Sequence, residues 1–117
     1  VLVNGLSSGT SKTELQNRIN AVQDIIDVNE AKTIIESYFA TNSVTVSKYN
    51  NNTLKQTAFL SKANEIVNGL GVTISITNSV NDGNRNTTYT INITKNGVVV
   101  SSSVYVSFIR GWFIVFN

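Results

Sequence analysis

The C-terminal third of the chain, residues 72–116, most constrains the fold, because apolar and polar residues alternate there in several short runs. Residues 72–77 and 87–94 both follow the period of two that is typical of a half-buried β-strand. Between 94 and 98 the chain carries Asn96-Gly97, which favours a type I′ turn because both central residues of that turn need a positive φ. We therefore predict that residues 87–94 and 98–109 are antiparallel neighbours in a sheet.

Three details of this region carry separate predictions. Residues 80–86 concentrate Asn, Asp and Gly, which indicates an exposed loop. Ser101–Ser103 interrupts an apolar run and is consistent with a bulge or an edge position. Residues 112–116 are apolar on both faces, so we expect a strand there that is covered on both sides.

The first forty residues read as helical. Ser11 and Glu14 have the spacing of a capping box, and the helix that follows should run from about 12 to 26. Its apolar residues share one face: Leu15, Ile19, Val22 and Ile26. Asp27 and Glu30 resemble a second helix start, and we explain both carboxylates by capping rather than by an active site. One kinked helix and two separate helices both fit, and we favour two.

The next elements are a strand over 44–49 and a helix over 53–69 that ends at Gly69 and Gly71. A helix just before an antiparallel meander usually packs across its apolar face. The predicted fold is α+β, with N-terminal helices followed by a four- to five-stranded antiparallel β-meander packed by one helix. Residues 1–10 are interpreted as a flexible lead-in and residues 11–117 as a single α+β domain.

The composition is polar but weakly charged. Charged residues make up 14% of the chain, and Asn, Ser and Thr supply the polarity instead, with seventeen, thirteen and thirteen residues. Such compositions are common in β-rich secreted proteins, and an AT-rich genome also raises the Asn content. The net charge is only +2 and no basic stripe is visible, so we expect no nucleic-acid partner. We also expect no membrane span, because no apolar run is long enough.

The chain has no His and no Cys, which excludes His-based acid–base catalysis, thiolate chemistry and zinc sites with these ligands. Most of the seven acidic residues fall on predicted helix surfaces, and none forms a convincing catalytic pair. The serines lack an evident base. We therefore expect no enzyme, no metal and no cofactor.

Four residues are the candidate ligand-binding residues of the sequence. Asp82 and Arg85 occupy the tip of the predicted loop, where a polar partner can be met. Tyr105 and Trp112 are aromatic residues that can stack on a sugar ring, although Trp112 also fits a packing role at a strand end.

The segment Ser11-Lys12-Thr13-Glu14-Leu15-Gln16-Asn17-Arg18-Ile19-Asn20-Ala21-Val22-Gln23 resembles the short helices that recur between modules of Gram-positive bacterial surface and secreted proteins. The resemblance covers about a fifth of the chain and implies an extracellular or cell-surface location in a multimodular parent. It assigns no functional residue. The order of helix and meander is also similar to the cystatin-like arrangement, but the inhibitory loop motif is absent, so only the architecture is suggested.

These observations favour a non-catalytic adhesion, interaction or spacer module of a bacterial surface or secreted protein. Its expected partner is a polysaccharide or another surface protein. The alternative is a carbohydrate-binding or carboxylate-dependent glycan-cleaving domain, which requires a cleft with an exposed aromatic residue. A third hypothesis is a self-assembling subunit that pairs through the strand over 98–106. The sequence leaves the oligomeric state open.

Overall fold

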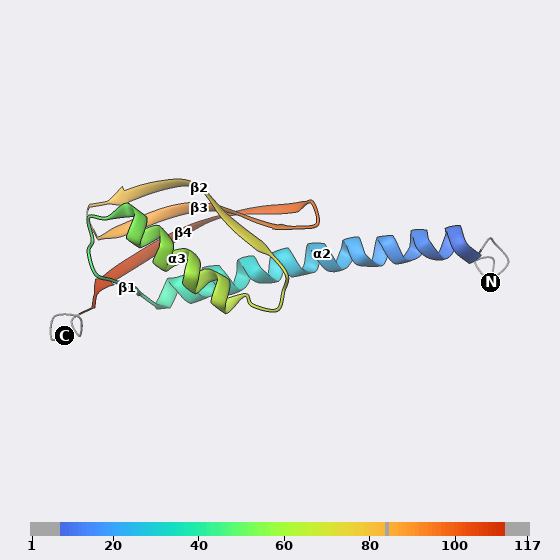
Figure 1. Cartoon of the computed structure of the whole chain (residues 1–117), viewed down its shortest axis with the longest axis horizontal. Coiled ribbons are helices and arrows are strands. Elements are labelled where there is room, and N and C mark those ends of the chain that lie inside the picture. Colours follow the sequence, from blue (N-terminus) through green and yellow to red (C-terminus); the bar gives the residue numbers. More distant parts are fainter. Residues whose placement is uncertain (1–7, 84, 112–117) are drawn as a thin grey trace.

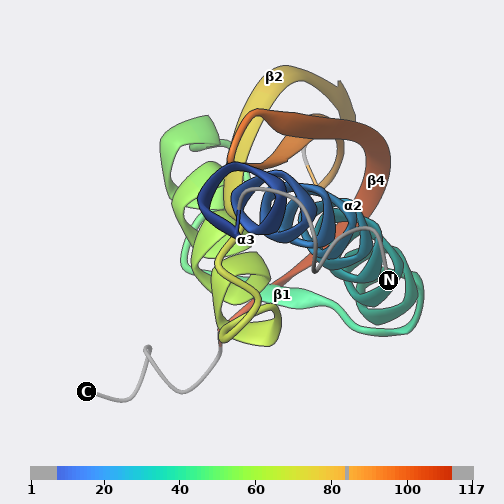
Figure 2. The same cartoon turned by 90° about the vertical axis from the view of Figure 1, so that its right-hand side faces the viewer.

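The structure is a computed structural model that describes residues 8–83 and 85–111. Two helices lie on one face of a four-stranded sheet, and no other described element covers the opposite face (Figures 1 and 2). The elements are α2 (Ser8–Thr41), β1 (Val44–Val46), α3 (Asn52–Ile66), β2 (Thr73–Asp82), β3 (Asn86–Lys95) and β4 (Val98–Arg110). The predicted α+β class is confirmed, and the predicted strand over 112–116 lies outside the described residues.

The sheet is mixed, so the prediction of an entirely antiparallel sheet was wrong. Its strand order is β1-β4-β3-β2, and β2, β3 and β4 form the predicted antiparallel meander. β1 is parallel to β4, with Val44 opposite Phe108. This pairing buries Val44 and Val46 in the core beside Phe108. The short strand thus joins the sheet next to β4, which begins more than fifty residues later in the chain.

The Asn96-Gly97 hairpin is confirmed. Asn96 has a φ of 49° and Gly97 a φ of 85°, as a type I′ turn requires. Another prediction for the sheet was wrong. β2 continues to Asp82, so the predicted loop over 80–86 shrinks to a turn between Asp82 and Asn86. Ser101–Ser103 pairs regularly with β3 and holds no bulge, but it does lie at an edge of the sheet, because β1 pairs only with residues 108–110 of β4. The sheet's irregularity lies in β2, between Ile76 and Asn78.

The N-terminal helix is one continuous helix of 34 residues, so the preferred division into two helices was wrong. It also begins at Ser8, earlier than the predicted start at about residue 12. Asp27 does not cap a helix. Its carboxylate accepts a hydrogen bond from Lys95 instead, a partner far away in the sequence. Asp27 therefore lies in the middle of α2, where it accepts a hydrogen bond from the sheet.

Helix α3 begins with a side-chain cap, because the Asn51 Oδ1 atom accepts a hydrogen bond of 3.0 Å from the backbone nitrogen of Leu54. It ends at Ile66, three residues before the predicted end. The chain then turns through Gly69 and Gly71, whose φ angles of 99° and 71° are positive. The predicted packing of this helix against the sheet is confirmed, since Phe59 is buried on Tyr89 of β3. The prediction that one helix alone packs the sheet was wrong, because α2 lies on the same face.

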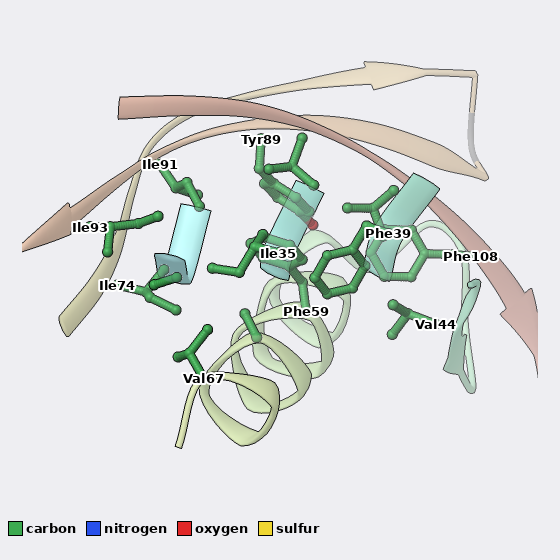
Figure 3. Close-up of a cluster of buried hydrophobic side chains, with 14 of the residues drawn as sticks. Ile35, Phe39, Val44, Phe59, Val67, Ile74, Tyr89, Ile91, Ile93 and Phe108 are labelled. Atoms are coloured by element: carbon green, nitrogen blue, oxygen red, sulfur yellow. The ribbon is translucent and has the colours of Figure 1, made fainter. Parts of the chain in front are cut away.

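The core lies between the two helices and the inner face of the sheet, and Figure 3 shows it as one cluster. Four aromatic rings cross it in series. Phe59 stacks on Tyr89 at 4.6 Å between centroids and contacts Phe39 at 5.0 Å, while Phe108 meets Tyr89 edge-on at 6.4 Å. Each such side chain contributes on the order of 2 kcal/mol by its burial. Both helices and the sheet supply residues to this core. The helices and the sheet therefore form one structural unit.

Helix α2 is longer than the sheet that it supports (Figure 1). The β3–β4 turn meets the helix at two places, Asp24 and Asp27. Towards the N-terminus from there, every side chain from Lys12 to Gln23 is exposed. The molecule measures 71 × 28 × 22 Å, and this projecting half of α2 accounts for much of its length. Within the described residues, neither helix has the length and apolar character needed to cross a membrane.

Candidate functional site

The projecting half of α2 and the turn that follows it carry large apolar side chains that remain in contact with water. Their exposed fractions are 42% for Leu15, 61% for Ile19, 55% for Val22, 48% for Ile25 and 50% for Ile26. We call these five residues the α2 stripe. Scattered exposed apolar residues are ordinary, but a contiguous row on one element marks an interaction site. The sequence predicted four of the five as one helix face.

Four of the five stripe residues lie on the side of α2 opposite to the core-facing residues, and Ile25 lies between the two sides. At about 100° per residue, Leu15, Ile19, Val22 and Ile26 cluster around one direction. The residues that pack under the sheet are Val28, Ala31, Ile35 and Phe39. Their directions cluster roughly 180° away from the stripe. The stripe is therefore not a continuation of the helix face that packs under the sheet.

The face that bears the stripe changes character where the sheet begins. Further along the same face come Asn29, Thr33 and Ser37, all exposed and polar. An outer helix face is normally polar, and this one follows the rule wherever the helix covers the sheet. The apolar side chains occur only on the projecting half, where another molecule has free access.

The apolar row has a spacing of four, three and four positions along the chain, from Leu15 to Ile19, Val22 and Ile26. This is the alternation with which one helix packs against another in a coiled coil. Gln16, Arg18 and Gln23 flank the row, so the apolar strip is narrow and has a mainly uncharged border. Its shape suits a helix better than a small molecule.

The second candidate surface contains two of the four residues predicted from the sequence. The Tyr105 hydroxyl donates a hydrogen bond of 3.1 Å to Asp82 Oδ2 and accepts one of 2.9 Å from Asn86 Nδ2. The Tyr105 side chain remains 49% exposed on the open face of the sheet, and Val80 in β2 is 58% exposed. Asp82 and Tyr105 are thus brought together as one polar cluster.

A third predicted residue, Arg85, makes its contacts outside this cluster. Arg85 donates a hydrogen bond of 3.0 Å from Nε to the carbonyl oxygen of Phe108. Its guanidinium also lies 5.6 Å from the centroid of the Tyr49 ring. Arg85 therefore fastens the β2–β3 turn to the end of β4. Trp112 lies outside the described residues.

A hollow of about 330 Å³ lies between α2 and β4, and its lining includes Tyr105, Glu36 and Phe39. Glu36 is its one carboxylate, and the Glu36 Oε2 atom accepts a hydrogen bond of 2.6 Å from Ser102. A glycosidase of the common type needs two carboxyl groups flanking the substrate. The hollow can accept a ligand, but its described lining does not form such a pair.

Several charged groups of the described chain hold the fold together. Lys95 Nζ donates to Asp27 Oδ2 at 2.6 Å and to the Leu70 carbonyl at 2.8 Å. The hydrogen bond from Lys95, followed by one from Gln23, lowers the pKa of Asp27 against the opposing effect of burial. Lys55 is 1% exposed, and its burial lowers the pKa of its ammonium group. Across residues 8–83 and 85–111, no group of three acidic side chains is arranged to hold a metal ion.

Comparison with known proteins gives no relative to which this site can be matched. No protein-family model, no curated protein and no solved structure shows significant similarity to the chain. The function must therefore be argued from the two surfaces themselves.

Proposed function

We propose that this chain is a non-catalytic interaction module of a bacterial surface or secreted protein, and that it docks through the projecting half of α2. The observation that carries the proposal is the α2 stripe, five half-exposed apolar side chains that no other element of the described chain covers. Keeping such a row in water is unfavourable, and a partner that covers it removes that cost.

The helix itself supports this role. An isolated helix of about 15 residues is marginally stable in water, and the side chains of residues 12–23 are all exposed, so packing adds little to the stability of this half. It is continuous with the well-packed half under the sheet, which fixes its direction. The fold thus acts as a rigid base that presents one helix face.

The surface or secreted setting rests on composition and on the resemblance of residues 11–23 to helices between bacterial surface modules. A surface rich in Asn, Ser and Thr, with few charged residues, fits an extracellular domain. The non-catalytic role rests on the residue types: the chain has no His or Cys to act as acid, base or nucleophile.

The test is photo-crosslinking in the cells that make the protein. A photoreactive amino acid at position 19, within the stripe, should give a cross-linked adduct of higher mass. The same group at position 17 is the matched control, because Asn17 is exposed on the opposite side of the projecting helix and should give little adduct. Equal labelling at both positions, or none at position 19, would refute docking through the stripe.

A second candidate function, carbohydrate binding, is favoured by one observation: Tyr105 is half exposed, lines a hollow and holds Asp82 and Asn86 in place. A pull-down on insoluble peptidoglycan, chitin and cellulose tests it. Retention that is lost in Tyr105→Ala and kept in Ile19→Ala would assign binding to the sheet face. No retention on any polymer would remove this candidate.

A further inference from the structure

We propose that the occupant of the α2 stripe is a second copy of this chain, packed antiparallel so that the projecting helices of two molecules lie side by side. This inference rests on the proposed function, since it names the partner of the same surface. It goes beyond that function by specifying the stoichiometry, the direction and the residue register.

The spacing of the stripe is self-complementary in the antiparallel direction. If Ile19 of one copy lies opposite Val22 of the other, then Leu15 lies opposite Ile26, and the reverse pairs follow by symmetry. This register makes four consecutive apolar layers from four residues per copy. Other antiparallel registers are possible with the same spacing of four and three residues. Each of them places some of these four residues opposite polar residues.

The charges along α2 select the antiparallel direction over the parallel one. Lys12 lies near the start of the segment and Glu30 near its end, and both lie on the side of the helix that bears the row. An antiparallel pair places Lys12 of each copy next to Glu30 of the other. A parallel pair would place Lys12 opposite its own equivalent, two like charges at one position of the seam.

The rest of the fold leaves room for this arrangement. In the proposed register the first turns of one helix reach the outer face of the other near Asn29 and Thr33. Both residues are exposed, because the sheet lies on the other side of α2. The two sheets then lie at opposite ends of the paired helices and do not meet.

The size of the interface predicts a weak, reversible dimer. Covering the four seam residues on both copies removes on the order of 700 Å² from water before flanking residues are counted, which is below the usual size of specific interfaces. We therefore expect dissociation constants on the order of micromolar, with monomer at high dilution. A concentration series is needed to see both states.

The first experiment uses the absence of natural cysteine. Leu15→Cys and Ile26→Cys are made separately, mixed, and treated with a short thiol-reactive cross-linker. In the antiparallel register these two positions face each other, whereas two copies of position 15 lie about 16 Å apart along the helix axis. The mixture should give a cross-linked dimer that neither variant gives alone.

The second experiment measures mass by sedimentation equilibrium of the full chain. Ile19→Lys should weaken dimerisation on the order of 100-fold, because it leaves a charge in an apolar seam. Mixing Ile19→Lys with Val22→Glu should restore a dimer, since these positions are opposite in the proposed register. Asn17→Lys, on the far side of the helix, is the control and should leave dimerisation unchanged.

Three outcomes would overturn the inference: cross-linking of Leu15→Cys with itself, a chain that stays monomeric at high concentration, or a monomer that instead sediments with anionic lipid vesicles. Each is distinguishable from failure of the proposed function. A photo-adduct at position 19 in cells combined with a monomer in solution would keep the docking role and assign it to a different partner.

Discussion

Asp27 is the residue at which α2 stops projecting and becomes part of the fold. Its carboxylate receives hydrogen bonds from Lys95 and Gln23, and Lys95 also binds the Leu70 carbonyl. Three segments that are distant in the sequence therefore meet at one ammonium group. In the sequence, the same carboxylate looks like a helix cap, because Asp is favoured both at helix starts and wherever a cation needs a partner.

Because the Lys95 and Gln23 hydrogen bonds lower the pKa of Asp27 in the folded state, its contribution to stability should depend on pH. The unfolded chain binds a proton at this carboxyl more readily than the folded chain. The contribution is thus present above the unfolded pKa of about 4 and is lost as the pH falls through the lower folded pKa. Urea unfolding of wild type and Asp27→Asn between pH 7 and pH 2 measures it.

The free energies of unfolding of wild type and Asp27→Asn should converge as the pH falls towards 2. The Lys95→Met variant should show the same dependence on pH as Asp27→Asn. A constant difference between wild type and Asp27→Asn at all pH values would mean that the ionised carboxylate contributes nothing through Lys95.

Phe59 is the central residue of the core, fully buried between Phe39 and Tyr89. Phe59→Ala should lower the free energy of unfolding by about 3–5 kcal/mol, through lost burial and the cavity that remains. Leu15→Ala is the matched control in dilute protein, and it should change stability by less than about 0.5 kcal/mol because Leu15 is exposed. Comparable losses in both variants would mean that the projecting half belongs to the core.

At the scale of the elements, sequence patterns predicted the features that depend on neighbouring residues alone. The Asn96-Gly97 turn and the alternation of β3 and β4 follow from backbone conformation and side-chain period, and both were predicted. The parallel pairing of Val44 with Phe108 was not, because it depends on a contact between distant segments. The division of α2 at Asp27 was wrong for the same reason, since the partner of Asp27 is Lys95.

The candidate site shows the same limit. The helical spacing of Leu15, Ile19 and Val22 was visible in the sequence, but a stripe that faces a core and a stripe that faces water have the same spacing. Only the length of the sheet decides between them. One signal was available in the sequence: the row ending at Ile26 and the row starting at Val28 are out of phase by about half a turn.

The two halves of α2 should differ in stability although they form one helix. Backbone amides of residues 12–23 should exchange with solvent on the order of 100-fold faster, or more, than those of residues 28–39 in dilute protein, because only the latter are packed. Hydrogen exchange followed by mass spectrometry measures this. Slow exchange over 12–23 at concentrations where the chain is monomeric would contradict it.

The whole molecule is elongated for its length. Its radius of gyration of 19.6 Å exceeds the value of about 13 Å expected for a compact domain of this size. The excess comes from the projecting half of α2, so the overall shape is sensitive to how two copies combine. Small-angle X-ray scattering over a concentration series can therefore distinguish the possible dimers.

An antiparallel dimer overlaps two molecules over residues 8–33 and leaves the two sheets at opposite ends. The maximum dimension should then rise from the 71 Å of the monomer to on the order of 100 Å as the concentration increases. A parallel dimer would keep the length near that of the monomer and increase the thickness, because both sheets would lie at the same end. In Ile19→Lys the scattering should remain that of the monomer, since the same apolar seam that joins the helices also sets the length of the dimer.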